Sequence, residues 1–295
     1  MDKLVSAVIT THNRIDLLLK AIESVKTQTY RNIECIVVDD VSTDETKRIM
    51  EEYQEKGDIK YIRIDVSRGG NFARNEGIRN SEGEYIAFLD DDDEWYPTKI
   101  EKQLHKLDEH PDAKLCYCSL RRVYNGGEKI EDLDVNTMKE GDLSKEILKG
   151  VICTTSAMMV EKNLLYEIGL FDESLKFWQE YDLCIRICQK TKVVAVRENL
   201  VLYRINIVDT ARLTNKLQGW EEAVRQVEDK YKDLFATLSP EETMERQKAI
   251  VIDGLWRCFF SGNKKAQKTY LKKRFYLEKT IRNLLKYVLN RGMHL

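Results

Sequence analysis

Five acidic residues follow one another directly after an apolar segment, and this run is the part of the sequence most suited to chemistry. Residues 90–94 read DDDDE and follow the apolar residues 85–89. Carboxylates packed this closely raise one another's pKa unless a cation lies among them. Mg²⁺ and Mn²⁺ prefer oxygen ligands, and Mg²⁺ commonly binds one or two carboxylates together with substrate phosphates. The run therefore predicts a divalent-metal site, with a solvated acidic turn as the alternative.

Two other polar loops follow apolar segments of the same kind. The letters TTHNR follow residues 4–9, and DDVSTD follows residues 33–38. Asp, Ser and Asn are also ordinary helix N-caps, so each loop taken alone has a second explanation. Three polar loops at one edge of a sheet are harder to explain as caps, and together they favour a binding site.

The elements that must position these loops form a repeating pattern over the first 90 residues. Strands are predicted at 4–9, 33–38, 59–64 and 85–89, with apolar residues at helical spacing between them. Strands separated by helices imply right-handed crossovers and a mainly parallel sheet. Ligands bind beyond the carboxyl ends of such strands, which is where the three polar loops lie.

The rest of the chain reads as mixed structure that ends in helices. Helices are predicted at 97–107, 142–150 and 179–190, and strands near 115–118, 122–124, 157–160 and 193–203. Everything after about residue 219 reads as three consecutive helices. We therefore expect an α/β domain over residues 1–205, with a mostly parallel sheet flanked by helices, and a C-terminal helical region over residues 206–295.

Composition places the chain among globular proteins and narrows the chemistry. The 295 residues are 42% hydrophobic and 33% charged, which is enough for a sizeable core. No run of about 18 apolar residues and no signal-peptide pattern occurs, so we expect a cytoplasmic protein. The seven cysteines contain no CxxC pair and the four histidines are scattered, so neither a disulfide framework nor a zinc site is predicted.

Five motifs in order resemble those of family 2 glycosyltransferases. They read VITTHNR, VVDDVSTD, ARNEGI, GEYIAFLDDDD and QEYDL, and the resemblance covers about residues 3–205. It implies a GT-A fold, which is a Rossmann-like nucleotide-binding sheet. It also implies a nucleotide-sugar donor, by family habit a UDP-sugar, a divalent cation, Mn²⁺ or Mg²⁺, and an inverting displacement.

The resemblance also implies roles for single residues. Asp92 would hold the metal as the last carboxylate of a DXD element, whose register the four aspartates leave open by one position. Asp40 would accept a hydrogen bond from the base, and Asp91 would lie near the ribose. The full set expected to bind the nucleotide-sugar is Thr10, Thr11, Asn13, Arg14, Asp40, Arg68, Arg74, Asp90 and Asp91.

The catalytic base departs from the family pattern. The family usually has an aspartate in a Glu-Asp pair, whereas this chain has Gln179-Glu180 at that place. The resemblance assigns the base to Glu180, with Asp182 as the second candidate. An acid at a helix N-terminus is also favoured by the helix dipole, which is the alternative explanation for Glu180. Trp178 is expected either to stack on the acceptor sugar or to be a core aromatic.

The charge is unevenly distributed. Residues 263–295 contain ten basic residues and one acid, which gives +9, and the preceding 262 residues carry −11. Apolar residues recur at helical spacing among the basic ones, as in helices that bind the interface of anionic membranes. The alternative is an apolar stripe packed on the catalytic domain or on a second subunit, as in a homodimer. No recognition module accompanies the basic residues, so nucleic acid is not an expected partner.

The expected function is that of a metal-dependent hexosyl- or N-acetylhexosaminyl-transferase. Its acceptor would be a glycan or a lipid-linked saccharide in bacterial surface polysaccharide synthesis, and a lipid-linked acceptor would suit a peripheral location on the inner face of the plasma membrane. Two alternatives stay open. A nucleotidyltransferase would share the metal-bound nucleotide but release pyrophosphate, and a non-catalytic scaffold would bind the sugar nucleotide without turnover.

Overall fold

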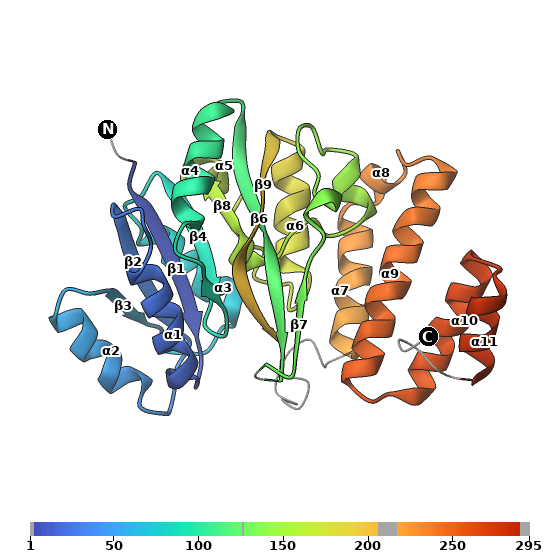
Figure 1. Ribbon diagram of the computed structural model, residues 1–295, viewed down its shortest axis with the longest axis horizontal. Coiled ribbons are helices and arrows are strands. Elements are labelled where there is room, and N and C mark those ends of the chain that lie inside the picture. Colours follow the sequence, from blue (N-terminus) through green and yellow to red (C-terminus); the bar gives the residue numbers. More distant parts are fainter. Residues whose placement is uncertain (1–2, 126, 206–216, 290–295) are drawn as a thin grey trace. The chain divides into compact units, whose positions relative to one another are not determined.

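The chain, seen here in a computed structural model, divides into two compact units (Figure 1). The structure describes residues 3–125, 127–205 and 217–289. Unit 1 comprises Met1–Leu143, Ile152–Ser174 and Gln179–Asn206, and unit 2 comprises Ser144–Val151, Leu175–Trp178 and Ile207–Leu295. The domain boundary expected at 205/206 adjoins residues 206–216, which lie outside the described residues. The sequence pattern did not predict that Ser144–Val151 and Leu175–Trp178, which interrupt unit 1 along the chain, belong to unit 2.

Four parallel strands form the first half of the sheet in unit 1. They are β1 (Val5–Thr11), β2 (Ile33–Asp39), β3 (Lys60–Arg63) and β4 (Tyr85–Asp90), in the order β3-β2-β1-β4. The connecting helices are α1 (Ile15–Lys26), α2 (Thr46–Glu55) and α3 (Gly70–Arg79). The four strands predicted in the first 90 residues are confirmed, with buried apolar residues through most of β1, β2 and β4 and only half-buried or exposed residues in the edge strand β3.

The second half of the sheet mixes directions. β8 (Met158–Glu161) is antiparallel to both neighbours, β4 and β6 (Ala113–Tyr124), whereas β9 (Lys192–Ile205) runs parallel to β6. β5 (Glu94–Trp95) pairs with β9, and β7 (Lys129–Asp132) forms a hairpin with β6. The other elements of unit 1 are α4 (Lys99–Glu109), η1 (Val135–Thr137), η3 (Thr155–Ala157), α5 (Lys162–Glu167) and α6 (Gln179–Cys188).

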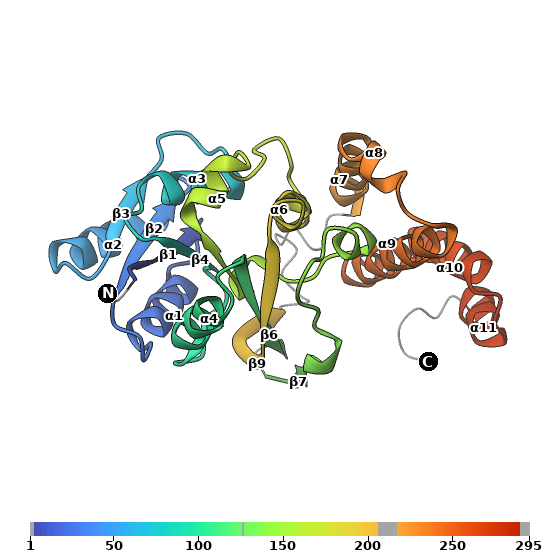
Figure 2. The same cartoon turned by 90° about the horizontal axis from the view of Figure 1, so that it is seen from above.

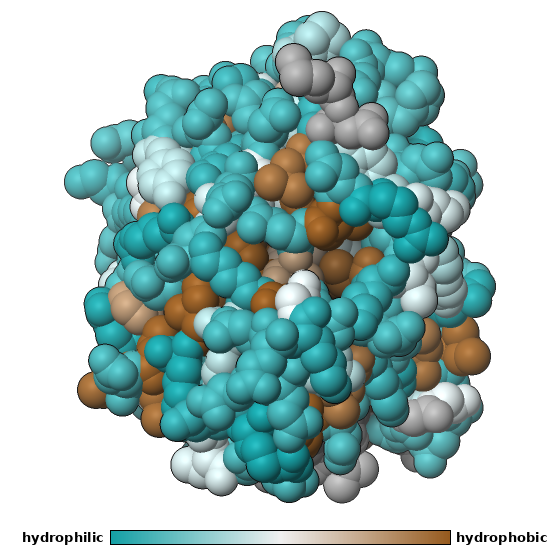
Figure 3. All heavy atoms as spheres, turned by 90° about the vertical axis from the view of Figure 1, so that its left-hand side faces the viewer, coloured by the Kyte–Doolittle hydropathy of each residue, from teal (hydrophilic) through white to brown (hydrophobic). Residues whose placement is uncertain are grey.

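Helices cover both faces of this sheet. α1 and α4 lie on one side of the strands, and α3 and α5 lie on the other (Figure 2). The approach of α3 to β1 depends on Gly77, since a Cβ there would lie 2.3 Å from Cγ1 of Val8. The surface at the end of unit 1 that carries α2 and β3 is largely hydrophilic (Figure 3). The sheet of unit 1 therefore lies between two layers of helices (Figure 2).

Unit 2 is helical. Its elements are η2 (Glu146–Lys149), α7 (Leu217–Lys230), α8 (Lys232–Phe235), α9 (Pro240–Phe260), α10 (Lys264–Leu277) and α11 (Ile281–Leu289). The prediction of three helices after residue 219 was too low, because caps divide the segment. Ser239 and Glu242 form a capping box that starts α9, and Asn263 caps α10. Among the described residues, no helix has the length and apolar content needed to cross a bilayer.

Candidate active site

The loops after β1 and β4 meet through side-chain contacts. Thr11, the last residue of β1, donates from Oγ1 to Oδ2 of Asp91 at 2.7 Å. Nη1 of Arg14 lies 3.2 Å from Oδ1 of Asp91 and 3.3 Å from Oδ2 of Asp92. The contact follows from the register, because Thr10 pairs with Asp90 on adjacent parallel strands. The structure thus brings Thr11, Arg14, Asp91 and Asp92 together.

The four aspartates of the acidic run face different surroundings. Asp91 is buried, and this burial, partly offset by Arg14, raises the pKa of its carboxyl to about 6. Asp93 is buried as well, and burial followed by the charges of Asp92 and Asp90 raises its pKa well above the usual value. The Asp92 side chain is 14% exposed and the Asp90 side chain 31% exposed. Among the four aspartates, Asp90 and Asp92 are therefore the most open to a ligand.

These carboxylates fit a hard divalent cation only in combination with a ligand. Among the described residues, no three His, Cys, Asp or Glu side chains come together as a metal cage. Mg²⁺ commonly needs only one or two protein carboxylates when substrate phosphates complete its shell. Asp92, with Asp90 close by in the same turn, supplies such a partial set of oxygen ligands. The donor chemistry is therefore compatible with Mg²⁺ or Mn²⁺ at Asp92.

Asp39 and Asp40 have separate tasks. Asp39 is fully buried, where it accepts from the Ser42 amide at 2.7 Å, the Tyr61 hydroxyl at 2.7 Å and Arg63 at 2.5 Å. These bonds fix the loop in which the β-branched Val41 adopts a φ of 63°, a strained left-handed conformation. Asp39 is thus a structural residue of the loop.

Asp40 instead caps the loop that leads into α3. Its Oδ1 accepts from the Arg68 amide at 3.1 Å, and its Oδ2 accepts from the Gly69 amide at 3.1 Å and from the Ser67 hydroxyl at 2.9 Å. The carboxylate is 8% exposed, so the chain holds it in one orientation. This contact joins the loop after β2 to the loop after β3.

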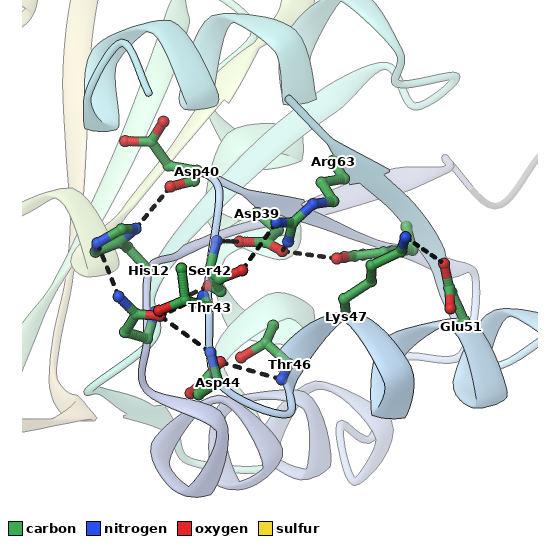
Figure 4. A network of polar contacts seen from close by, with 12 residues as sticks. His12, Asp39, Asp40, Ser42, Thr43, Asp44, Thr46, Lys47, Glu51 and Arg63 are labelled. Carbon is green, nitrogen blue, oxygen red and sulfur yellow. Dashed lines mark hydrogen bonds and ion pairs between the residues drawn. The ribbon is translucent and has the colours of Figure 1, made fainter. Parts of the chain in front are cut away.

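The loop after β1 also holds the loop after β2 (Figure 4). Nδ1 of His12 donates to the Asp40 carbonyl at 2.6 Å, since a carbonyl oxygen can only accept. Oδ1 of Asn13 accepts from the Thr43 amide at 2.6 Å and from the Asp44 amide at 3.3 Å. Asn13 has a φ of 55°, a left-handed conformation that asparagine tolerates. We call these contacts of His12 and Asn13 the loop clamp.

Two arginines of the predicted site lie next to acids. Nη2 of Arg74, a buried residue of α3, lies 2.6 Å from Oδ1 of Asp90. The Arg68 side chain is 55% exposed and pairs with Glu173 at 2.9 Å, while its guanidinium lies over the Phe72 ring. Arg74 therefore belongs to the group around the acidic run, whereas the Arg68 side chain contacts Glu173 and Phe72.

The two candidate bases on α6 differ in exposure. Glu180 lies half-buried in the first turn of the helix. Asp182 is fully buried and pairs with Arg186 at 2.6 Å, and Arg186 also donates to the carbonyls of Ile168 and Leu170. These contacts give Asp182 a structural role. The assignment of the base stays a prediction, with Glu180 the more accessible carboxylate.

Trp178 lies in unit 2 and is buried there. Its ring packs edge-on against Trp220 with a centroid distance of 5.8 Å, and its Nε1 donates to Oδ2 of Asp253 at 3.1 Å. Only 6% of the residue is exposed. This is the packing that the core-aromatic alternative expects, and the role in acceptor binding stays a prediction.

Sequence reasoning missed the residue that closes the acidic turn. Oγ of Ser156, in η3, donates to Oδ2 of Asp93 at 2.6 Å and accepts from the Asp90 amide at 3.1 Å. The Arg204 amide donates to Oδ1 of Asp93 at 3.1 Å. Ser156 and Arg204 are distant in sequence and stand in no motif, so only the tertiary fold reveals them.

Comparisons with known proteins show which family the chain resembles. The sequence model of the family "Glycosyl transferase family 2" matches residues 6–169. An uncharacterized glycosyltransferase of Rickettsia prowazekii is 34% identical, with 93% of this chain and 82% of the relative covered. One of Methanocaldococcus jannaschii is 31% identical, with 70% of this chain and 72% of the relative covered.

Solved structures show the same fold. The crystal structure of S. aureus TarS 1–349 has a TM-score of 0.59 at 17% identity and covers 97% of this chain and 88% of its own. The structure of that protein in complex with UDP-GlcNAc has a TM-score of 0.60 at 16% identity and covers 97% of this chain and 89% of its own. The expected GT-A fold is therefore confirmed. Because the family model matches more than half of the chain, and a relative above 30% identity is covered over most of its length, this chain belongs to glycosyl transferase family 2.

Proposed function

We propose that this glycosyltransferase moves a hexosyl or N-acetylhexosaminyl group from a UDP-sugar to a hydroxyl of a glycan or lipid-linked saccharide, with inversion at the anomeric carbon. The observation that carries the proposal is the contact of Arg14 with both Asp91 and Asp92, beside Thr11, at the carboxyl ends of adjacent parallel strands. Ligands of α/β sheets bind at such ends. The solved complexes of TarS with UDP and UDP-GlcNAc, which share the fold, support a UDP-sugar as the donor.

The donor would be held by the residues grouped around the acidic run. Arg14 and Arg74 offer guanidinium groups for the diphosphate, because Arg forms charge-assisted hydrogen bonds to phosphate oxygens. Asp40 and Asp91 would accept from the base and the ribose. Thr10, Asn13 and Arg68 would complete the set, and Thr10 and Asn13 lie on or beside the end of β1. When bound at Asp92, Mn²⁺ or Mg²⁺ would offset charge on the diphosphate.

The chemical step proposed for Glu180 is general base catalysis. Its carboxylate takes the proton from the acceptor hydroxyl as that oxygen attacks the anomeric carbon. The bond from the anomeric carbon to the diphosphate oxygen breaks at the same time, and the nucleoside diphosphate leaves with that electron pair. Attack from the face opposite the leaving group inverts the configuration. Surface polysaccharide synthesis would supply acceptors of this kind.

Binding and turnover of the purified full chain test the proposal together. The melting temperature of the chain is measured with UDP-sugars, GDP-sugars and dTDP-sugars, each with and without Mn²⁺. A ligand that binds only the folded chain stabilises it by about 2.7 kcal/mol at about 100 times its Kd. We expect a metal-dependent shift with UDP-sugars that Asp92→Asn removes. Glu180→Gln should keep the shift and lose about 10²–10⁴-fold in release of UDP. Asp182→Asn should instead lower the melting temperature without ligand, because it breaks a buried ion pair with Arg186.

Other outcomes would replace the proposal. Release of pyrophosphate from a nucleoside triphosphate would identify a nucleotidyltransferase. Binding of the sugar nucleotide with no release of nucleoside diphosphate, over a panel of saccharide acceptors, would identify a non-catalytic scaffold. An unchanged rate in Glu180→Gln would move the base to another carboxylate.

A further inference from the structure

Helix α11 is oriented against the usual rule for a surface helix. Its apolar side chains face outward, with exposed fractions of 40% for Leu284, 50% for Leu285, 63% for Val288 and 54% for Leu289. The residues turned toward the rest of unit 2 are polar, namely Asn283 at 4% and Lys286 at 5%. An amphipathic helix of a globular protein ordinarily buries its apolar stripe. The apolar stripe of α11 is thus presented outward.

Local hydrogen bonds at the start of α11 and one ion pair connect this helix to α9. Nδ2 of Asn283 donates to the carbonyl of Glu278 at 3.0 Å and to Oε2 of Glu278 at 3.2 Å. The Glu278 carboxylate also pairs with Lys248 of α9 at 3.1 Å. Burial and the neighbouring Arg282 and Arg274 lower the pKa of Lys286. The polar face is therefore turned inward by these contacts, and within the described part of the chain the apolar side chains stay exposed.

The exposed residues of α10 and of the turn before α11 are strongly basic. Lys265, Lys268, Lys272 and Lys273 are exposed along α10, and Lys279 is exposed just before α11. The single acid of residues 263–295, Glu278, already pairs with Lys248. Tyr276, at the end of α10, is 63% exposed, and aromatic residues of this kind favour the membrane–water interface. Exposed apolar groups among cations are complementary to an anionic lipid surface.

We propose that α10 and α11 dock the protein on a membrane rich in anionic lipid. Leu284, Leu285, Val288 and Leu289 enter the interfacial layer, and the lysines of α10 contact the headgroups. A second copy of the chain is a poorer occupant, because an isologous contact would set one +9 segment against another. The proposal goes beyond glycosyl transfer and needs no sugar nucleotide for its test.

Vesicle binding by the full chain tests this docking surface. The probes are phosphatidylcholine vesicles with and without about a quarter phosphatidylglycerol, separated by centrifugation. Wild type should bind the anionic vesicles at least about tenfold better, and added salt should weaken the binding. The double variant Leu285→Ser/Val288→Ser should lose about tenfold, since it removes apolar area from an exposed face. Ile252→Ser, at a 41% exposed position of α9, is its matched control and should bind as wild type does.

Two double charge-reversal variants distinguish an effect of the α10 lysines from an effect of the net charge of the chain. Lys272→Glu/Lys273→Glu should abolish most of the binding, whereas Lys190→Glu/Lys192→Glu, which changes the net charge of the chain equally from exposed positions of unit 1, should not. Equal loss in both variants, or no preference of wild type for anionic vesicles, would overturn the proposal. A dimer in light scattering that Leu285→Ser/Val288→Ser dissociates would assign the face to a second copy instead. Circular dichroism confirms that each variant is folded.

Discussion

Lys99 is a fully buried lysine in α4. Its Nζ donates to Oε1 of Gln103 at 2.7 Å and lies 4.1 Å from the centroid of the Trp95 ring, and no carboxylate is among the groups that shift its pKa. Burial lowers its pKa to about 8 from 10.5. Unfolded chain therefore binds the proton more tightly than folded chain between these two values, and this contribution to the free energy of unfolding rises with pH.

The consequence is a stability difference that depends on pH in a defined direction. The penalty of burying the charge is fully present below pH 8 and fades as the pH approaches 10.5. Lys99→Met removes this penalty, so its free energy of unfolding should exceed that of wild type at pH 7. The difference should shrink by about 2 kcal/mol between pH 7 and pH 10. Denaturant unfolding at both pH values measures this. Lys102→Met, at a side chain of the same helix that is 38% exposed, is the matched control. A constant difference for Lys99→Met would contradict the lowered pKa.

Neighbouring acidic residues have different roles that the sequence alone does not predict. The carboxyl ends of β2 and β4 were predictable, because in each an apolar run is followed by acids. Which of two neighbouring aspartates fixes the loop was not predictable, because it depends on partners such as Arg63 and Tyr61 that arrive through the fold. The same holds for Asp182, whose partner Arg186 fixes carbonyls of another segment. Residue type predicted the chemistry, and tertiary contacts divided the roles.

Among the elements, the loop clamp makes two consecutive βα units act as one. Asn13 is suited to this position by its tolerance of a φ of 55° and by an acceptor that reaches the Thr43 amide at 2.6 Å. Asn13→Ala loses the acceptor and places Cβ strain on the left-handed backbone, so it should lower the free energy of unfolding by about 1–2 kcal/mol. Asn13→Gly also loses the acceptor but removes the backbone strain, so it should lower the free energy of unfolding by less than Asn13→Ala does. Thermal or denaturant unfolding measures both.

A third variant separates positioning from direct contact with the nucleotide. Asn13→Asp keeps an acceptor oxygen and tolerates the left-handed conformation. If Asn13 acts by holding the loop after β2, the aspartate variant keeps most of the stability and most of the affinity for UDP. If the Asn13 amide touches the diphosphate, the added negative charge weakens binding while stability is kept.

Sequence patterns predicted the helices and strands well where these depend on residues close together in the sequence. The four parallel strands and their helices follow from alternation of apolar runs, and the capping box at Ser239 could have been read from its Ser-Pro-Glu-Glu letters. The antiparallel insertion of β8 between β4 and β6 had no such signal, since strand order depends on contacts far apart in sequence. Residues 142–150 were predicted as a helix but form only the short 3₁₀ turn η2.

Over the whole molecule, every side-chain contact that carries the donor proposal lies within unit 1. The residues of the loop clamp, the acidic run and Arg74 all fall between residues 10 and 94. Basic charge and outward apolar groups belong instead to α10 and α11 of unit 2. We therefore expect donor binding and membrane docking to be separable functions of the chain.

Hydrogen exchange of the full chain, with and without UDP and Mn²⁺, tests this division. At short labelling times exchange reports local opening, so a ligand protects the loops it contacts. Protection should appear in segments 10–14, 40–43, 67–74 and 90–93, and amides of α7, α9 and α10 should exchange as before. Asp92→Asn should lose the protection at 90–93 under the same conditions, and Mn²⁺ alone serves as the control. Protection spread over α9 and α10, or none in the acidic run, would mean that the donor is bound by residues other than those grouped around Arg14.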